Sequence, residues 1–169
     1  RHKTLNNYIE AKFKLIKNQN SKGVAFVNKN NKIFLKKINL NKIESKIFKV
    51  GDKIDKKILN QIKNPYFLTD SNKQNLSFIL SISKKLNLKK SILINTLKNF
   101  KGLKYRQQTI YDSENLKIIN DSKSTSYSSS LSLLNSLKNI FWILGGIPKR
   151  GDKFLLSKKN SSHIRAYIF

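Results

Sequence analysis

The chain has 169 residues, which is enough for one well-packed core or two small ones. It contains no cysteine, which excludes disulfides, thiolate metal sites and a cysteine nucleophile. A formal net charge of +26 would ordinarily indicate nucleic acid or an anionic membrane as a partner. Only four of the 35 basic residues are arginine, however, and the lysines are scattered along the chain, so we interpret most of them as a solvated surface.

The sequence suggests a soluble piece of a larger protein. No apolar run approaches the length of a membrane span and no signal peptide opens the chain, so we expect a cytoplasmic protein without a membrane partner. The chain starts at Arg1, has no methionine, and ends in residues that resemble the start of another strand. We therefore expect a fragment whose ends both lie inside domains.

The first fifty residues predict one helix and three strands. Apolar residues recur every three or four positions in the helix, at Leu5, Tyr8, Ile9, Phe13 and Ile16. The helix should begin near Thr4 and end between Asn18 and Asn20. Short apolar segments at 23–27, 33–35 and 47–50 predict strands, with a turn over 28–32 between the first two.

Residues 59–102 predict further helices and a domain boundary. Residues 59–64 are ambiguous, and Pro65 ends whatever precedes it. A long helix is predicted from Ser71 and another near Ser91, which we place as its N-cap. Gly102 breaks the helical pattern. We therefore predict two domains, residues 1–101 and residues 102–169, with the boundary between them.

The last third predicts a strand–helix–strand unit. Residues 109–111 and 116–119 are expected to be paired strands, followed by a helix that opens among the serines and by a strand at 140–144. We expect the two strands that flank the helix to be neighbouring parallel strands, and the loops after them leave from their C-terminal ends, where open α/β sheets bind ligands. The helix start should also attract anions. We therefore assign the chain to the α/β class.

Three motifs in this region resemble the Mur ligase family. They are Asp121-Ser122-Lys123-Ser124-Thr125-Ser126, Leu144-Gly145-Gly146-x-x-Lys149 and Phe100-x-Gly102-Leu103-x-Tyr105-Arg106. Two earlier motifs are similar to the same family, Tyr8-x-x-Ala11-Lys12 and Ser71-Asn72-Lys73-Gln74-Asn75. The motifs stand in the family's order at similar spacing, which is more specific than any one of them alone.

The resemblance implies a fold and a function. Residues 1–101 would be the end of a central ATP-binding domain, and 102–169 the first part of a Rossmann-like C-terminal domain. The implied enzyme is an ATP-dependent amide ligase of peptidoglycan precursor synthesis that adds D-glutamate to UDP-N-acetylmuramoyl-L-alanine through an acyl phosphate. It would use ATP and Mg²⁺, act as a monomer, and have no specific nucleic-acid partner.

The resemblance also implies roles for residues around the nucleotide. Lys12 would carry a carbamate that binds Mg²⁺, although a solvent-facing lysine is the simpler interpretation. Asn72 and Asn75 would face the adenine together, with helix capping as an equally good alternative. Arg106 would contact phosphate or ribose oxygens, and Asp121 would bind the ribose or orient Arg106.

Three further residues are implied at the reacting groups. Lys123 would stabilise the transferring phosphate, Thr125 would hold the carboxylate of the incoming amino acid, and Lys149 would recognise D-glutamate. The alternatives are structural, because Asp-Ser-x-Ser/Thr is also a helix-capping sequence and Gly145-Gly146 is also a turn.

The sequence departs from the family pattern in ways that limit these expectations. Serine stands at Ser71 and tyrosine at Tyr105 where the family usually has histidine, and Ser126 replaces an asparagine. The family's phosphate loop, Gly-x-x-x-x-Gly-Lys followed by Ser or Thr, does not occur in the chain, so we do not expect it to turn over by itself.

Two other functions stay open at this point. Aromatic residues interleave with lysines in Lys46-Ile47-Phe48-Lys49, as in a basic nucleic-acid-binding module, although strands with polar outward faces produce the same pattern. A sibling ligase that adds a different amino acid is the second alternative.

Overall fold

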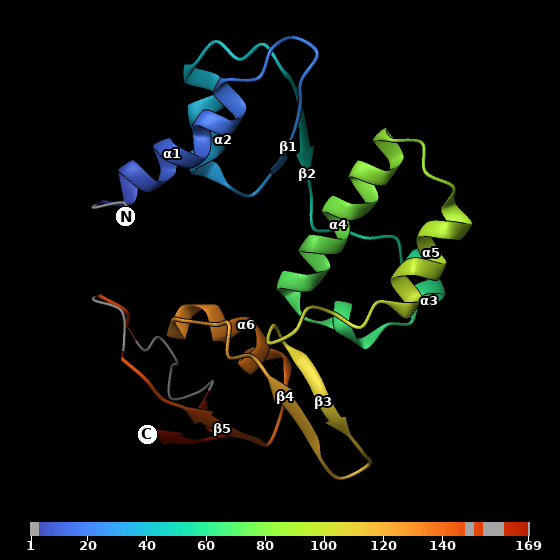
Figure 1. Cartoon of the computed structure of the whole chain (residues 1–169), viewed down its shortest axis with the longest axis vertical. Coiled ribbons are helices and arrows are strands. Elements are labelled where there is room, and N and C mark those ends of the chain that lie inside the picture. The colour runs from blue at the N-terminus through green and yellow to red at the C-terminus, as the bar shows by residue number, and fades with distance from the viewer. Residues whose placement is uncertain (1–3, 148–150, 154–160, 169) are drawn as a thin grey trace. The chain divides into compact units, whose positions relative to one another are not determined.

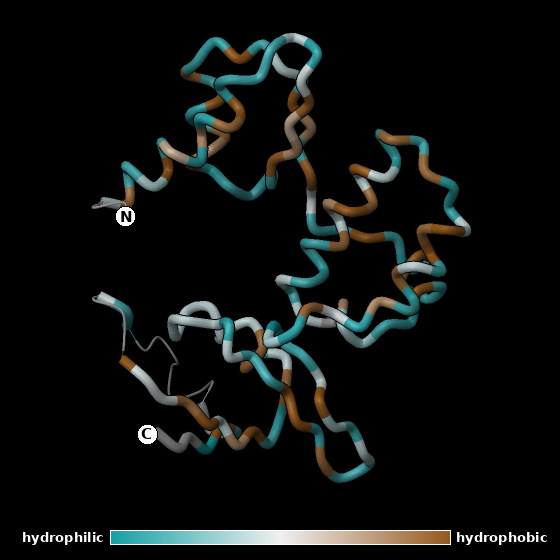
Figure 2. Tube along the Cα trace, viewed as in Figure 1, coloured by the Kyte–Doolittle hydropathy of each residue, from teal (hydrophilic) through white to brown (hydrophobic). Residues whose placement is uncertain are grey.

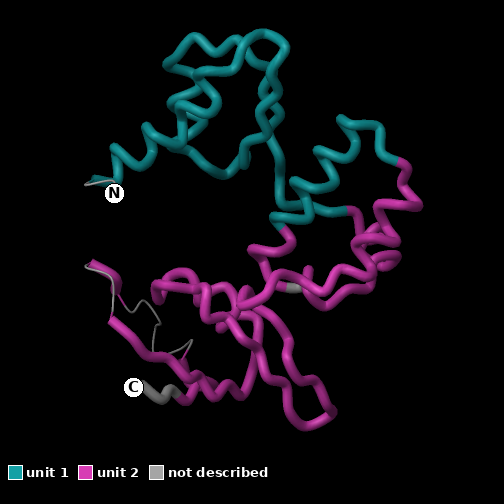
Figure 3. Tube along the Cα trace, viewed as in Figure 1, with its two compact units in different colours: residues 1–54, 74–88 teal, residues 55–73, 89–169 magenta. Residues whose placement is uncertain are grey.

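The structure is a computed structural model that describes residues 4–147, 151–153 and 161–168. Contacts within the chain divide it into two compact units (Figure 3). The first unit comprises residues 1–54 and 74–88, and the second comprises 55–73 and 89–169. The boundary that we predict after residue 101 falls inside the second unit and stays a prediction.

A pair of parallel strands lies at the centre of the first unit (Figure 1). Strand β1 (Val24–Asn28) pairs with β2 (Lys46–Val50), and both predicted strands are confirmed. Parallel neighbours need a crossover between them, which helix α2 (Lys32–Leu40) supplies. Phe26 and Phe48 stack on each other with ring centroids 5.2 Å apart.

Helix α1 (Leu5–Lys17) confirms the first predicted helix. Thr4 caps it by accepting a hydrogen bond from the backbone N–H of Asn7 at 3.2 Å. Apolar and hydrophilic residues alternate along the helix (Figure 2), and Phe13 is only 1% exposed. The core around β1 contains Ile16, Ala25 and Val27, with Phe34, Ile38, Ile43 and Ile47 packed against it.

The strand that we predict at 33–35 is wrong, because these residues lie in α2. Asn31 begins the helix by accepting a hydrogen bond from the backbone N–H of Phe34 at 3.1 Å. Phe34 and Ile38 are four residues apart and both pack against the core of the unit. The three apolar residues thus belonged to a helical period that extends beyond the short window. The turn that we expect over 28–32 leads into this helix and not into a second strand.

Four helical segments follow, of which α4 and α5 confirm predicted helices. They are α3 (Lys56–Ile62), the 3₁₀ helix η1 (Pro65–Leu68), α4 (Asp70–Lys85) and α5 (Lys90–Asn99). The ambiguous residues 59–64 are helical as far as Ile62. Ser91 is not the N-cap of α5: Lys89 holds that place without a side-chain cap, and Ser91 lies in the first turn.

An aromatic cluster in the second unit fixes the chain after α5. Phe67 is 2% exposed, and the ring of Tyr66 meets the rings of Phe67 and Phe100 edge-on at 5.2 and 5.1 Å. Asn64 donates to the carbonyl of Phe100 at 2.7 Å and so holds the end of α5 against η1. Gly102, with φ +78°, lies directly against Tyr66.

The rest of the second unit carries the predicted strand–helix–strand order. Its elements are β3 (Gln108–Asp112), β4 (Lys117–Asn120), α6 (Tyr127–Ser136), β5 (Ile140–Leu144) and β6 (Ile164–Ile168). The predicted pairing of β3 with β4 is confirmed and is antiparallel, whereas β5 pairs in parallel with β6. Within the described residues β4 and β5 share no ladder, so our expectation that they are neighbouring parallel strands is wrong. The short β3–β4 hairpin supplies a local partner for β4 instead.

The fold is therefore a mixture of helices and strands, in agreement with the α/β class. The Rossmann-like description of residues 102–169 stays a prediction. In the part of the chain that the structure covers, no helix combines the length and the apolar character needed to cross a membrane.

Candidate functional site

The chain turns sharply after β4, as the sequence predicts. The backbone N–H of Ser124 donates to the carbonyl of Asp121 at 2.8 Å, and the Ser124 hydroxyl donates to Asp121 Oδ2 at 2.7 Å. The backbone N–H of Lys123 donates to the carbonyl of Tyr105 at 3.0 Å. These bonds hold the turn from within and attach it to the segment that carries Arg106. The side chains of Lys123 and Thr125 are exposed.

The carboxylate of Asp121 is held from both sides. Its Oδ1 accepts a hydrogen bond from the backbone N–H of Gln107 at 3.0 Å, and its Oδ2 accepts from Ser124. Each carboxylate oxygen can accept more than one hydrogen bond, so Asp121 retains capacity for a ligand hydroxyl. Its orientation is nevertheless fixed before any ligand arrives.

The charges of Arg106 and Asp121 both affect the pKa of the Tyr66 hydroxyl. The pKa of Tyr66 is raised, mainly because burial disfavours the phenolate. The positive charge of Arg106 lowers this pKa and the negative charge of Asp121 raises it. Arg106 itself is exposed, so its guanidinium is accessible to an anion.

The anion at the N-terminus of α6 is the side-chain carboxylate of Asp152. Ser126 and Ser129 form a capping box, and the backbone N–H of Tyr127 donates to Asp152 Oδ2 at 2.8 Å. Asp152 therefore attaches the segment after Gly151 to the helix that follows the Asp121 turn. Our sequence interpretation missed Asp152, and only its place three residues after Lys149 in the predicted ligand loop could have indicated it.

The two asparagines at the start of α4 lie in different surroundings. Asn72 is 5% exposed, and its Nδ2 donates to the carbonyl of Tyr66 at 2.8 Å and to Gln107 Oε1 at 3.0 Å. Asn75 is exposed. The expectation that both amides face the adenine stays a prediction. Asn72 is not the N-cap of α4, because it is the third residue of the helix, and its amide donates to Tyr66 and Gln107.

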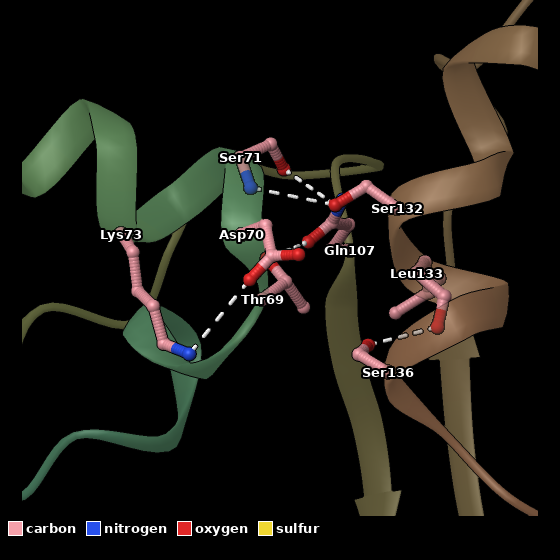
Figure 4. Close-up of polar contacts among 8 residues, drawn as sticks. All are labelled: Thr69, Asp70, Ser71, Lys73, Gln107, Ser132, Leu133 and Ser136. Atoms are coloured by element: carbon pink, nitrogen blue, oxygen red, sulfur yellow. Dashed lines mark hydrogen bonds and ion pairs between the residues drawn. The ribbon is translucent and has the colours of Figure 1, made fainter. Parts of the chain in front are cut away.

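The side chain of Ser71 contacts α6. The backbone N–H of Ser71 donates to Ser132 Oγ at 3.4 Å, and the two hydroxyls are 3.3 Å apart (Figure 4). Ser71 occupies the position where the Mur family usually has histidine. The hydroxyl here has a structural contact and has no imidazole proton to exchange.

Lys12 lies on the exposed face of α1 in the first unit. Its Nζ is 4.6 Å from the centroid of the Tyr8 ring, which is one helical turn earlier. This contact explains the Tyr-x-x-x-Lys spacing without any metal.

The predicted site residues are divided between the two units. Asn72, Arg106, Asp121 and Lys123 belong to the second unit, and Lys12 and Asn75 belong to the first. Lys149 lies outside the described residues.

Comparison with known proteins finds several curated relatives with one name, UDP-N-acetylmuramoylalanine–D-glutamate ligase. The relative from Wolbachia sp. subsp. Brugia malayi (strain TRS) is 33% identical over 94% of this chain and 34% of its own. The relative from Francisella philomiragia subsp. philomiragia is 33% identical over 59% of this chain and 25% of its own. That from Prochlorococcus marinus (strain MIT 9312) is 36% identical over 49% of this chain and 18% of its own. A scan against family models finds no match.

These matches and the motifs on the two loops show that the chain belongs to the Mur ligase family. Within the family it is most like the UDP-N-acetylmuramoylalanine–D-glutamate ligases. The names favour a ligase over the basic nucleic-acid-binding module that the charge left open. The chain spans about a third of the length of its Wolbachia relative, 34%.

Proposed function

We propose that the chain is part of an ATP-dependent ligase that joins D-glutamate to UDP-N-acetylmuramoyl-L-alanine in peptidoglycan precursor synthesis. The observation that carries this proposal is the 33% identity to a ligase of that name over 94% of the chain. The turn at Asp121 supports it, because an oriented carboxylate and two exposed cations lie on adjoining segments of one unit. The absence of a phosphate loop in the chain agrees with a segment that does not turn over alone.

In the proposed reaction a substrate carboxylate attacks the γ-phosphate of ATP, and the amine of D-glutamate displaces phosphate from the resulting acyl phosphate. The protein contributes position and charge rather than covalent chemistry. Lys123 stabilises the transferring phosphoryl group, and Arg106 contacts phosphate or ribose oxygens. Asp121 accepts a ribose hydroxyl or orients Arg106. Thr125 and Lys149 hold the carboxylates of D-glutamate.

The residues fit ATP better than they fit Mg²⁺. Arg106 and Lys123 offer the cations that a polyphosphate needs. By contrast, no group of three or more histidine or acidic side chains could hold a metal within the described residues. Mg²⁺ is commonly bound by one or two carboxylates together with substrate phosphates, so a carbamate on Lys12 would be sufficient as the protein's oxygen ligand.

The proposal is tested by the D-glutamate dependence of phosphate release in the full-length ligase that contains this segment. Phosphate release should require both ATP and D-glutamate, with UDP-N-acetylmuramoyl-L-alanine as acceptor. Replacing D-glutamate by L-lysine or a diaminopimelate should abolish it. Equal activity with one of those amino acids would identify a sibling ligase and overturn the proposal.

The substitution Lys149→Ala should raise KM for D-glutamate roughly 10- to 100-fold, because it removes one charge-assisted contact with a carboxylate. KM for ATP should change much less. Steady-state kinetics with each substrate varied in turn measures both values. Lys153→Ala, a nearby lysine with an exposed side chain, is the control, and equal rises in both KM values would contradict the assignment.

The substitution Lys12→Ala should lower kcat by at least about tenfold, the effect of removing even an outer partner of a metal ligand. Bicarbonate should not restore the activity, whereas short carboxylic acids should restore part of it by supplying the missing oxygen ligand. Lys14→Ala on the same helix is the matched control. An unimpaired Lys12→Ala enzyme would show that the lysine is only a surface residue.

A further inference from the structure

Tyr127 contacts the chain on both sides of the segment formed by residues 145–151. Its ring meets the ring of Trp142 in β5 edge-on, with centroids 6.3 Å apart, and Trp142 stands three residues before the segment begins. Its backbone N–H donates to Asp152 Oδ2 at 2.8 Å, and Asp152 is the first residue after the segment. One residue in the first turn of α6 therefore holds the chain at both ends of this segment.

The described residues of the 145–151 segment are exposed, Ile147 at 99%. A Cβ at Gly146 or Gly151 would meet no atom within 4 Å, so no other part of the chain packs where a side chain would stand. The hydrogen bond to Asp152 is by contrast partly buried, and its carboxylate acceptor makes it stronger than a bond between neutral groups. The second end of the segment therefore depends on Asp152 for its attachment to α6.

The same hydrogen bond stabilises α6. The first N–H groups of a helix have no partner within it and carry a partial positive charge, so a carboxylate is favoured there over a neutral side chain. Ser126 and Ser129 form the capping box of the same helix. A substitution of Asp152 thus affects both the helix and the segment, whereas the capping box lies within residues 126–129 and does not reach the segment.

We propose that Asp152 is a positioning residue that keeps Lys149 and Thr125 within reach of the same D-glutamate molecule. This inference rests on the proposed function, in which those two residues hold the carboxylates of D-glutamate. Thr125 stands two residues before Tyr127, and Lys149 stands three residues before Asp152. Each residue of chain spans at most about 3.6 Å, so the hydrogen bond between Tyr127 and Asp152 limits how far apart the two can lie. Asp152 itself does not contact the substrate.

The test measures the KM values for D-glutamate and ATP in the full-length ligase with the substitution Asp152→Ala. KM for D-glutamate should rise about tenfold, the effect of losing one hydrogen bond to a charged group, and KM for ATP should change by less than about twofold. Asp152→Asn keeps an acceptor oxygen, so its KM for D-glutamate should stay within about threefold of the wild type. Asp152→Ser replaces the alanine variant if that protein does not fold.

A second substitution tests whether Asp152 acts through Lys149. In a Lys149→Ala background, Asp152→Ala should raise KM for D-glutamate by no more than about twofold, because the residue that it positions is already absent. Two independent effects would instead multiply, and full multiplication would overturn the inference.

Ser129→Ala separates this role from stabilisation of α6. It removes the hydroxyl that accepts a hydrogen bond from the backbone N–H of Ser126 at 3.2 Å, and it leaves the contact with Asp152 in place. The helix should lose stability, but KM for D-glutamate should stay within about twofold of the wild type. Equal rises of this KM in Ser129→Ala and Asp152→Ala would show that Asp152 only stabilises the helix.

Trypsin tests the attachment without any activity, because the segment contains Lys149 and Arg150. Cleavage after these residues, followed by mass spectrometry, should be at least about threefold faster in Asp152→Ala than in the wild type, since a released segment opens more often. Asp152→Asn should be cleaved at nearly the wild-type rate.

The inference is overturned if a folded Asp152→Ala ligase keeps its KM for D-glutamate. Failure of the proposed function gives a different result, because the wild-type protein would then release no phosphate in response to D-glutamate. Faster cleavage of Asp152→Ala in that case would leave the attachment standing and overturn only its role in binding D-glutamate. Unchanged cleavage would overturn both.

Discussion

Lys123→Ala should lower kcat of the full-length ligase by roughly 100- to 1,000-fold, the usual cost of removing one group that stabilises transition-state charge. The fold of the turn should survive, because the contact that holds Lys123 uses its backbone N–H and the carbonyl of Tyr105 and does not involve the ammonium. The exposed side chain is therefore available to a transferring phosphoryl group. The KM values for ATP and D-glutamate should change much less than kcat, and phosphate release under saturating substrates measures the effect.

A lysine on the adjoining strand provides the control for this experiment. Lys117 in β4 is exposed and forms an ion pair with Asp112 at 2.8 Å, so Lys117→Ala removes a positive charge without touching the turn. Its kcat should stay within about twofold of the wild type, since exposed ion pairs contribute little. Similar losses in Lys117→Ala and Lys123→Ala would mean that net charge, and not the position of Lys123, determines the rate.

Gly102→Ala should reduce the free energy of unfolding of the chain by roughly 2–5 kcal/mol, by two effects. The φ of +78° lies in the left-handed region, which costs a residue with a side chain about 1–2 kcal/mol. A Cβ at this position would also lie 2.6 Å from Cε2 of Tyr66, and such overpacking costs about 1–3 kcal/mol. Because Tyr66 packs on Phe67 and Phe100, its ring has little freedom to move away. Urea denaturation of the variant and the wild type measures the difference.

Gly151 separates the two effects. Its φ is +81°, but a Cβ there would meet no atom within 4 Å, so Gly151→Ala should cost only the backbone strain of about 1–2 kcal/mol. If the two variants lose the same stability, the contact with Tyr66 is not what excludes a side chain at Gly102.

Elements with a strong local signal were predictable from the sequence. The apolar period of α1 and its Thr4 cap, the compact strand β1 and the serine cap of α6 all depend on neighbours within about four residues. The strand predicted at 33–35 was wrong, because a window of three residues does not distinguish a strand from one turn of a helix. The helix is indicated by the Asn31 cap and by the spacing of Phe34 and Ile38, which extend beyond that window.

In the candidate site, too, the features that depend on neighbouring residues were predicted, and those that depend on residues distant in the sequence were missed. The turn after Asp121 was predicted, because Asp-Ser-Lys followed by serine and threonine is a local signal for a turn and a helix start. Gln107 and Asp152 were missed, since glutamine and aspartate are ordinary surface residues until their partners are known. Their partners lie 35 and 25 residues away along the chain, at Asn72 and Tyr127.

The sequence by itself determined the family of this protein, most of its helices and strands, and the turn that carries Asp121 and Lys123. The tertiary structure decided which residues around that turn are held by others. The amide of Asn72 is buried and Asn75 is exposed. At the N-terminus of α6, the carboxylate of Asp152 accepts a hydrogen bond from the backbone N–H of Tyr127. The physical reason is that hydrogen bonds between distant side chains depend on a geometry that exists only once the chain has folded, whereas periodicity and capping are already present in neighbouring residues.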